Sequence, residues 1–179
     1  MKTFILMGMV SAGLMASASS AIIQFDLQGQ AGAGLLPGNE LHVVTSGGTG
    51  GEVGGGIFFD TSTNLLTINV AWGSGNGFVD MSGVVTGSHL HGPAGQAATA
   101  GVLIFLSRAD SSANNGSIGQ TVLVGSGDVA NLLAGNTYIN LHTGTNGSGE
   151  ARGNLVQVPE PSAWLLGVAG GAFLLRRRR

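Results

Sequence analysis

Apolar and polar residues alternate in short runs between residues 22 and 157, and turn residues separate the runs every eight to twelve positions. Alternation with a period of two places every second side chain on the same face of a strand, and regular spacing of such runs is typical of antiparallel sandwiches and barrels. The runs predict strands at 22–27, 41–44, 55–59, 65–72, 78–85, 87–91, 101–106, 120–124, 137–142 and 150–156. We therefore predict an all-β fold, an antiparallel Greek-key β-sandwich.

One short helix interrupts this pattern at residues 128–134, where Asp128 is a candidate N-terminal cap and Gly135 a C-terminal stop. Asn-Gly pairs at 76–77, 115–116 and 146–147 predict tight turns. The Gly-rich stretch 46–56 is expected to be a flexible loop. Because the strand pattern continues on both sides of it, we predict a single domain over residues 22–157.

Residues 1–21 have the pattern of a secretory signal peptide. Lys2 precedes an apolar run, and small residues follow at the spacing that signal peptidase requires. The apolar run is too short for a membrane-spanning helix. We expect cleavage by signal peptidase after Ala18 or Ala21.

Residues 158–179 combine three features in fixed order: Pro159, Glu160 and Pro161, then a short apolar run, then four arginines. This arrangement resembles the PEP-CTERM sorting tag of exported bacterial proteins. The resemblance implies recognition by an exosortase-type enzyme and delivery to the cell surface or extracellular matrix. The apolar run, at about 1.5 Å per helical residue, is short for a bilayer, so we expect only transient membrane contact before processing; a plain tail anchor is the alternative.

The charge of the central region excludes one class of function. Five of the seven basic residues lie in the terminal segments, which leaves Arg108 and Arg152 against eight acidic residues between 21 and 158. An acidic surface repels phosphate backbones, so we expect no nucleic-acid binding. The chain has no cysteine, which excludes disulfides and thiolate metal ligands. It also lacks the usual sequence signatures of serine hydrolases, P-loop proteins and zinc proteases.

Histidines and polar residues recur at alternate positions in the second half of the chain. Period-two geometry places His89 and His91 on one face of a strand and Leu90 on the other. The same rule aligns Asn140 with His142 in a later strand. Three of the four histidines are therefore expected to lie on the polar faces of two strands.

The next strand continues the polar face. Glu150, Arg152 and Asn154 alternate with apolar or small residues. Because a short loop joins this strand to the preceding one, an antiparallel hairpin is expected to bring His142 close to Glu150 and Arg152. His42 stands apart from these residues and is expected to be an edge or surface residue.

Two interpretations of these residues remain open. In one, His89, His91, His142 and Glu150 coordinate Zn or Cu, because imidazole and carboxylate suit both metals. In the other, Asn140, Glu150 and Arg152 form a hydrogen-bonded structural cluster, with Glu150 paired to Arg152 or to a histidine. The arginine opposes a cation electrostatically, which weighs against the metal site.

The same segments resemble the CHRD domain, a family named from chordin and also found in secreted microbial proteins. The segments that carry the resemblance are 89–95, 133–143 and 149–155. It implies an extracellular β-sandwich, similar in topology to Cu/Zn superoxide dismutase and immunoglobulin-like folds. It does not imply growth-factor antagonism, nor dismutase activity, because the fuller His and Asp set and the disulfide of that enzyme are missing.

The sequence thus favours a non-enzymatic structural or binding module that is exported to the cell surface or matrix. Its expected partners are the two export enzymes and matrix polysaccharide or other surface proteins. The alternative is an extracytoplasmic protein that binds Zn or Cu through the histidine cluster. Redox activity of the bound metal is a further option within this alternative.

Overall fold

The computed structural model describes residues 21–109 and 114–159. The predicted signal peptide and most of the predicted sorting tag, Glu160 and Pro161 included, lie outside the described residues. Within the described part, no helix is long and apolar enough to cross a membrane.

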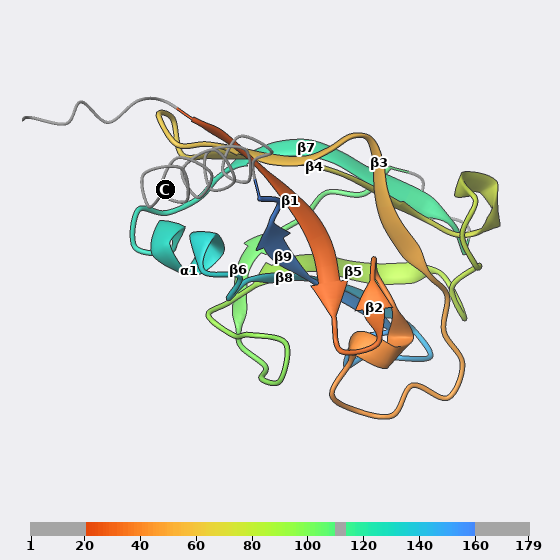
Figure 1. The fold of residues 1–179 in the computed structure, drawn as a ribbon. Coiled ribbons are helices and arrows are strands. Elements are labelled where there is room, and N and C mark those ends of the chain that lie inside the picture. Colours follow the sequence, from red (N-terminus) through yellow and green to blue (C-terminus); the bar gives the residue numbers. More distant parts are fainter. Residues whose placement is uncertain (1–20, 110–113, 160–179) are drawn as a thin grey trace, which may run out of the picture.

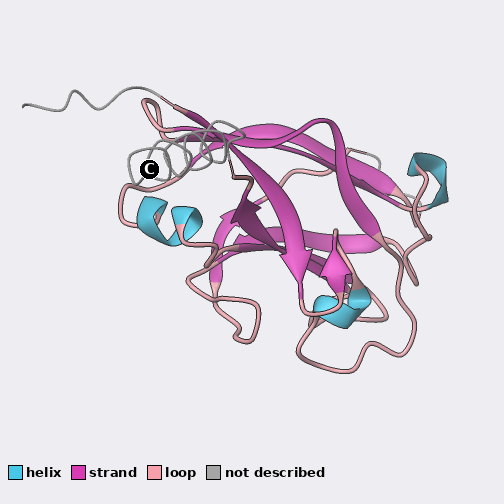
Figure 2. Cartoon of the chain, viewed as in Figure 1, coloured by secondary structure: helices cyan, strands magenta, loops and turns pink. Residues whose placement is uncertain are grey.

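Antiparallel strands dominate the described residues, and they form one continuous sheet that curls on itself (Figures 1 and 2). The order along the sheet is β6-β5-β8-β9-β1-β3-β4-β7, with the short β2 paired to β1. The elements are β1 (Ile22–Gly29), β2 (Gly32–Ala33), η1 (Pro37–Asn39), β3 (Gly50–Asp60), β4 (Leu65–Trp72), η2 (Ser74–Asn76), β5 (Val85–His91), β6 (Val102–Phe105), β7 (Gly116–Leu123), α1 (Val129–Leu133), β8 (Tyr138–Thr143) and β9 (Ala151–Gln157). The prediction of an all-β, sandwich-like antiparallel fold is confirmed.

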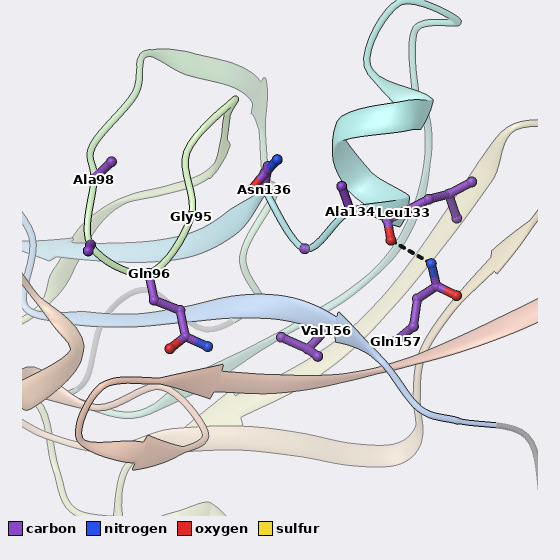
Figure 3. A pocket seen from close by; sticks show the side chains of 10 residues that line it. Gly95, Gln96, Ala98, Leu133, Ala134, Asn136, Val156 and Gln157 are labelled. Carbon is purple, nitrogen blue, oxygen red and sulfur yellow. Dashed lines mark hydrogen bonds between the residues drawn. The ribbon is translucent and has the colours of Figure 1, made fainter. Parts of the chain in front are cut away.

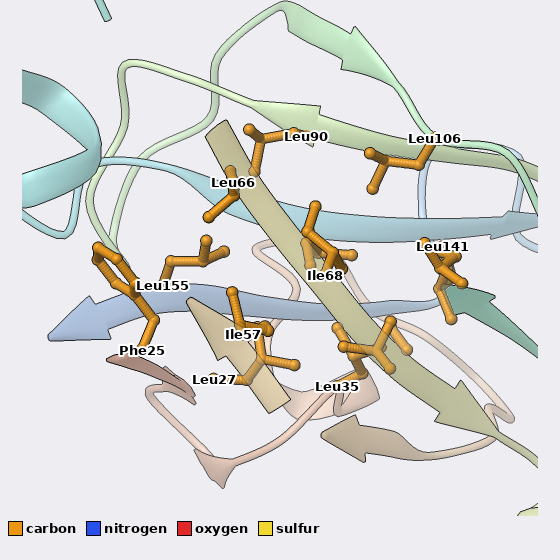
Figure 4. Close-up of a cluster of buried hydrophobic side chains, with 14 of the residues drawn as sticks. Phe25, Leu27, Leu35, Ile57, Leu66, Ile68, Leu90, Leu106, Leu141 and Leu155 are labelled. Atoms are coloured by element: carbon orange, nitrogen blue, oxygen red, sulfur yellow. The ribbon is translucent and has the colours of Figure 1, made fainter. Parts of the chain in front are cut away.

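The curled sheet forms two layers around an apolar core. One layer contains β3, β4 and β7, the other β5, β8 and β9, and β1 runs obliquely between them (Figure 1). Figure 4 shows Leu66 and Ile68 of β4 facing Leu90, Leu141 and other side chains of the opposite layer. These leucines and isoleucines are at most 1% exposed, so burial of apolar surface holds the layers together.

Two predicted strands are wrong. Residues 41–44 form bends, and residues 78–84 form a loop, so that of the predicted strand 78–85 only Val85 belongs to a strand, β5. Residues 78–84 are held by hydrogen bonds outside the sheet, among them the bond from Met81 N to Asn114 O. Leu41, Val43, Val79 and Val84 are exposed there, and only Met81 is in the core, so these apolar residues do not line a buried strand face.

The Gly-rich stretch was expected to be a loop, yet Gly50–Gly56 belongs to β3. The pairing with β4 shifts register between Glu52 and Ile57, and Gly54 and Gly56 have φ values of +56° and +73°. The glycines therefore serve a β-bulge inside a long strand, because such φ values are open chiefly to glycine.

The predicted helix is present as α1, and Gly135 follows it with φ of +76°, as its stop role requires. Asp128 stands at its N-terminus, but the carboxylate makes no capping hydrogen bond. Of the three predicted Asn-Gly turns, Gly77 adopts the left-handed conformation after η2.

Candidate metal centre

β5, β8 and β9 place the three histidines, Asn140 and Arg152 on one face of a single layer. β8 lies between the other two strands, with His89 opposite Asn140 and Asn140 opposite Arg152. Leu90 and Leu141 point into the core, so His89, His91 and His142 must point away from it. The predicted facing of the histidines is confirmed.

The three imidazoles lie together. Ring centroids are 4.9 Å apart for His89 and His142, 5.5 Å for His89 and His91, and 6.0 Å for His91 and His142. One ring nitrogen from each lies within 4.8 Å of the others. Metal–nitrogen bonds of about 2.0–2.1 Å require these nitrogens to move roughly 1 Å closer when an ion binds.

Backbone carbonyls set which nitrogen of two histidines is free. Nδ1 of His91 donates to Ala100 O at 3.0 Å, and Nδ1 of His142 donates to Gly147 O at 3.1 Å, because a carbonyl only accepts. Nε2 of both rings is therefore unprotonated. These two Nε2 atoms, and Nδ1 of His89, are buried and have no hydrogen-bond partner. Each of the three neighbouring rings thus has a buried nitrogen without a partner, which is an arrangement a cation would complete.

Burial keeps these rings neutral. Loss of hydration, with the neighbouring His142, His91 and Arg108, lowers the pKa of His89 to about 4. Burial also lowers the pKa of His91 and of His142 below the usual value. All three lone pairs are consequently available at neutral pH.

An aromatic and cationic stack supports His91. The His91 ring stacks on the Tyr138 ring, with 4.9 Å between centroids and an interplanar angle of 6°. The Arg152 guanidinium lies 3.6 Å from the centre of the Tyr138 ring. Because β8 lies between β5 and β9, Tyr138 separates the imidazole from the cation. The Tyr138 hydroxyl also bonds Ala100, the residue that orients His91.

Arg152 is 1% exposed, and burial lowers its pKa below the usual value. It donates to the carbonyl oxygens of Gly95 and Ala98 at 2.9 and 2.8 Å and to Oδ1 of Asn154. Arg152 therefore fixes the loop that carries Ala100, whereas the sequence prediction gave it Asn140 and Glu150 as partners.

Glu150 belongs to a different group. Its carboxylate accepts hydrogen bonds from the Ser82 backbone and side chain, from Thr143 Oγ1 at 2.6 Å, from Asn146 Nδ2 at 3.0 Å and from Gly48 N at 2.9 Å. These bonds outweigh the effect of burial and hold the pKa of Glu150 below its usual value. The group of potential ligand atoms around His89 does not include Glu150.

The expected facing of Glu150 with Arg152 is wrong, for a local reason. Glu150 precedes β9, and Gly149 before it has φ of +133°, so strand alternation does not extend to this residue. Its partner Thr143 follows His142 in β8 and so points to the opposite face. Among the described residues the only ion pair joins His42 to Glu40, so the predicted pairing of Glu150 with Arg152 or a histidine is absent there.

Sequence reasoning missed Glu40. Its side chain is 3% exposed, and Oε2 lies 3.8 Å from Nδ1 of the exposed His42, which donates from Nε2 to Gly149 O at 2.9 Å. Burial raises the pKa of Glu40 to about 6, against the opposing charges of His42 and Arg152. His42 is a surface residue, as expected, but it is not isolated. Glu40 has no periodic partner in the sequence, so no pattern could have marked it as buried.

The groove in Figure 3 is a separate feature of about 670 Å³. It lies between the loop at Gly95, the end of α1 and β9, and Gln157 donates across it to Leu133 O. Small apolar residues and amides line it, without a titratable side chain. The chemistry of the described residues is therefore concentrated at the histidines.

The segments that form this site also match a known protein family. The model of the CHRD domain matches residues 32–155. The chain belongs to the CHRD domain family. The match spans every strand from β2 to β8 and most of β9, so this CHRD domain includes the three histidines, Tyr138 and Arg152. No curated protein and no solved structure matches the chain.

Proposed function

We propose that this CHRD domain is a metal-binding module of an exported protein, in which His89, His91 and His142 hold one Zn or Cu ion. The observation that carries the proposal is the cluster of three imidazoles, each with a buried and unpartnered nitrogen, in which one ring nitrogen of each lies within 4.8 Å of the others. Imidazole is a favoured ligand of both metals.

The surroundings of the rings support a ligand role. In metal sites a coordinating histidine commonly donates its second nitrogen to a backbone carbonyl or carboxylate, which fixes its tautomer. His91 and His142 make this bond to Ala100 and Gly147. Without an ion, three buried nitrogens lack partners, and such groups destabilise a fold by about 1–3 kcal/mol each.

A binding role is favoured over hydrolytic catalysis. Nucleophilic catalysis requires a hydroxyl or thiol hydrogen-bonded to its base. In the part of the chain that the structure describes, the imidazole ring of neither His91 nor His142 bonds to a hydroxyl, since both rings donate to carbonyls.

The cellular address is the second part of the proposal. The signal-peptide pattern at 1–21 and the PEP-CTERM-like tag at 158–179 support export, processing by signal peptidase and an exosortase-type enzyme, and retention at the surface or matrix. Polysaccharide or other surface proteins are the proposed neighbours there. A purely structural surface module is the competing function, and it requires no metal.

The test is the metal content of the purified protein after dialysis against Zn or Cu, measured by mass spectrometry. We expect one ion per chain, and less than a tenth of that in a His89→Ala, His91→Ala variant. His42→Ala is the matched control, because His42 is exposed and lies outside the cluster. Unchanged metal content in the double variant, or none in the wild type, would contradict the metal site and leave the structural module.

A further inference from the structure

The three histidines and the charges around them favour one metal ion and one oxidation state. We propose that the site is selective for monovalent copper over divalent zinc and divalent copper. This deepens the proposed function and rests on it. The inference follows from the number of ligands, from their charge and from the charges around them.

The protein supplies three ligands and no anion. The group of convergent ligand atoms contains His89, His91 and His142 alone among the described residues. The nearest candidate in sequence, Glu150, is saturated by hydrogen bonds elsewhere. Zinc held by three protein ligands takes water as its fourth, so it would need an added ligand from solvent here. Cu(I) has a filled d shell and forms stable three-coordinate complexes, so three imidazoles complete its shell.

Charge separates the two oxidation states of copper. Three neutral imidazoles leave the full charge of the ion uncompensated. The Arg152 guanidinium lies 3.6 Å from the centre of the Tyr138 ring, which stacks on His91, and the charge of Arg108 also acts on His89. Their repulsion is twice as large for a divalent as for a monovalent ion. Glu40 offsets part of the Arg152 charge, since the two side chains interact.

Aromatic side chains beside the histidines also favour the monovalent ion. Phe105, on the edge strand β6, meets the His89 ring edge-on at 4.9 Å and 90°. The Tyr138 ring stacks on His91, so a second aromatic ring contacts the cluster. An apolar shell lowers the local dielectric and disfavours the more highly charged state of an ion. The site therefore stabilises Cu(I) relative to Cu(II).

The experiment is an anaerobic competition on the full-length protein. Cu(I) is titrated against the chromogenic chelator bathocuproine disulfonate, and zinc is titrated against a zinc-responsive dye in parallel. We expect one Cu(I) per chain that a tenfold excess of zinc does not displace. His42→Ala should behave as wild type, and the His89→Ala, His91→Ala variant should lose the site.

The charge argument is tested by Arg108→Gln and Arg108→Lys, followed by the reduction potential of the copper-loaded protein. Removal of the charge should lower the preference for Cu(I) over Cu(II) about tenfold, a fall in potential of about 59 mV. The lysine variant should restore the wild-type value. Circular dichroism of both variants identifies any that fail to fold.

The outcomes separate the two proposals. Displacement of Cu(I) by zinc, or tighter binding of Cu(II) than of Cu(I), overturns the copper inference and leaves the metal-binding function intact. An absence of binding by all three ions overturns both. Equal potentials for wild type and a folded Arg108→Gln variant would overturn the role of charge in the selectivity.

Discussion

At the scale of single residues, burial of polar groups distinguishes this domain from a plain apolar sandwich. Glu40, Arg152 and the histidines all have polar atoms that are buried and lack a hydrogen-bond partner. Alternation in the sequence correctly predicted that the histidines share a face. It could not place Glu40 or Glu150, because both lie outside strands, where loop geometry sets the direction of a side chain.

Comparison with a Glu40→Gln variant should show that ionisation of Glu40 lowers the free energy of unfolding as the pH rises. The pKa of Glu40 in the folded state, about 6, lies above its usual value of 4.5, so the folded protein holds this proton more tightly. The stabilisation is present below about pH 4.5 and is lost as the pH rises through 6. Wild type should therefore lose up to about 2 kcal/mol relative to the glutamine variant between pH 4 and pH 7.5.

Urea unfolding of both proteins at several pH values measures this difference. The comparison depends on the change with pH rather than on the stability at one pH, so a constant effect of the amide cancels. A stability difference that stays constant from pH 4 to pH 7.5 would show that Glu40 titrates normally.

At the scale of elements, strand pairing follows the sequence wherever alternation is uninterrupted. β4 covers the predicted residues 65–72, and the second half of the chain is close to its prediction. The failures lie in 41–44 and 78–84, where most apolar residues are exposed in loops. The prediction covered only residues 55–59 of β3, because the glycines of its β-bulge resemble loop residues in the sequence.

Asn39 joins the connection after β2 to the strands beside it. Its side chain accepts from Ala31 N at 2.8 Å and donates to the carbonyl oxygens of Gly34 and Arg152, at 3.2 and 2.9 Å. Replacement by alanine removes all of these bonds, two of which are buried. We expect Asn39→Ala to lower the free energy of unfolding by about 2–4 kcal/mol.

Gln30→Ala is the matched control, because its exposed amide makes a single bond to Gln96 O. We expect that variant to stay within about 0.5 kcal/mol of wild type. Denaturant melts of the two variants check both values. Equal stability of Asn39→Ala and Gln30→Ala would mean that the buried network contributes nothing.

At the scale of the whole molecule, the terminal segments and the domain make separate contributions to the proposed function. Deletion of residues 159–179 should release the protein into the medium, because it removes the PEP-CTERM-like tag and leaves every strand intact. Immunoblots of cell, surface and medium fractions measure the distribution. The full-length protein expressed in parallel is the control, and unchanged surface retention of the truncated chain would contradict the sorting proposal.

The two ends of the described domain lie on neighbouring strands. β1 and β9 are antiparallel, with Phe25 opposite Gln157, and Val158 N donates to Gln24 O. A pulling force on residue 158 therefore acts first on the last residues of β9 and breaks its hydrogen bonds one after another, as in unzipping, rather than all at once. Since β9 carries Arg152, mechanical load on the C-terminal end would reach the support of the histidine cluster before it reached β4 or β7.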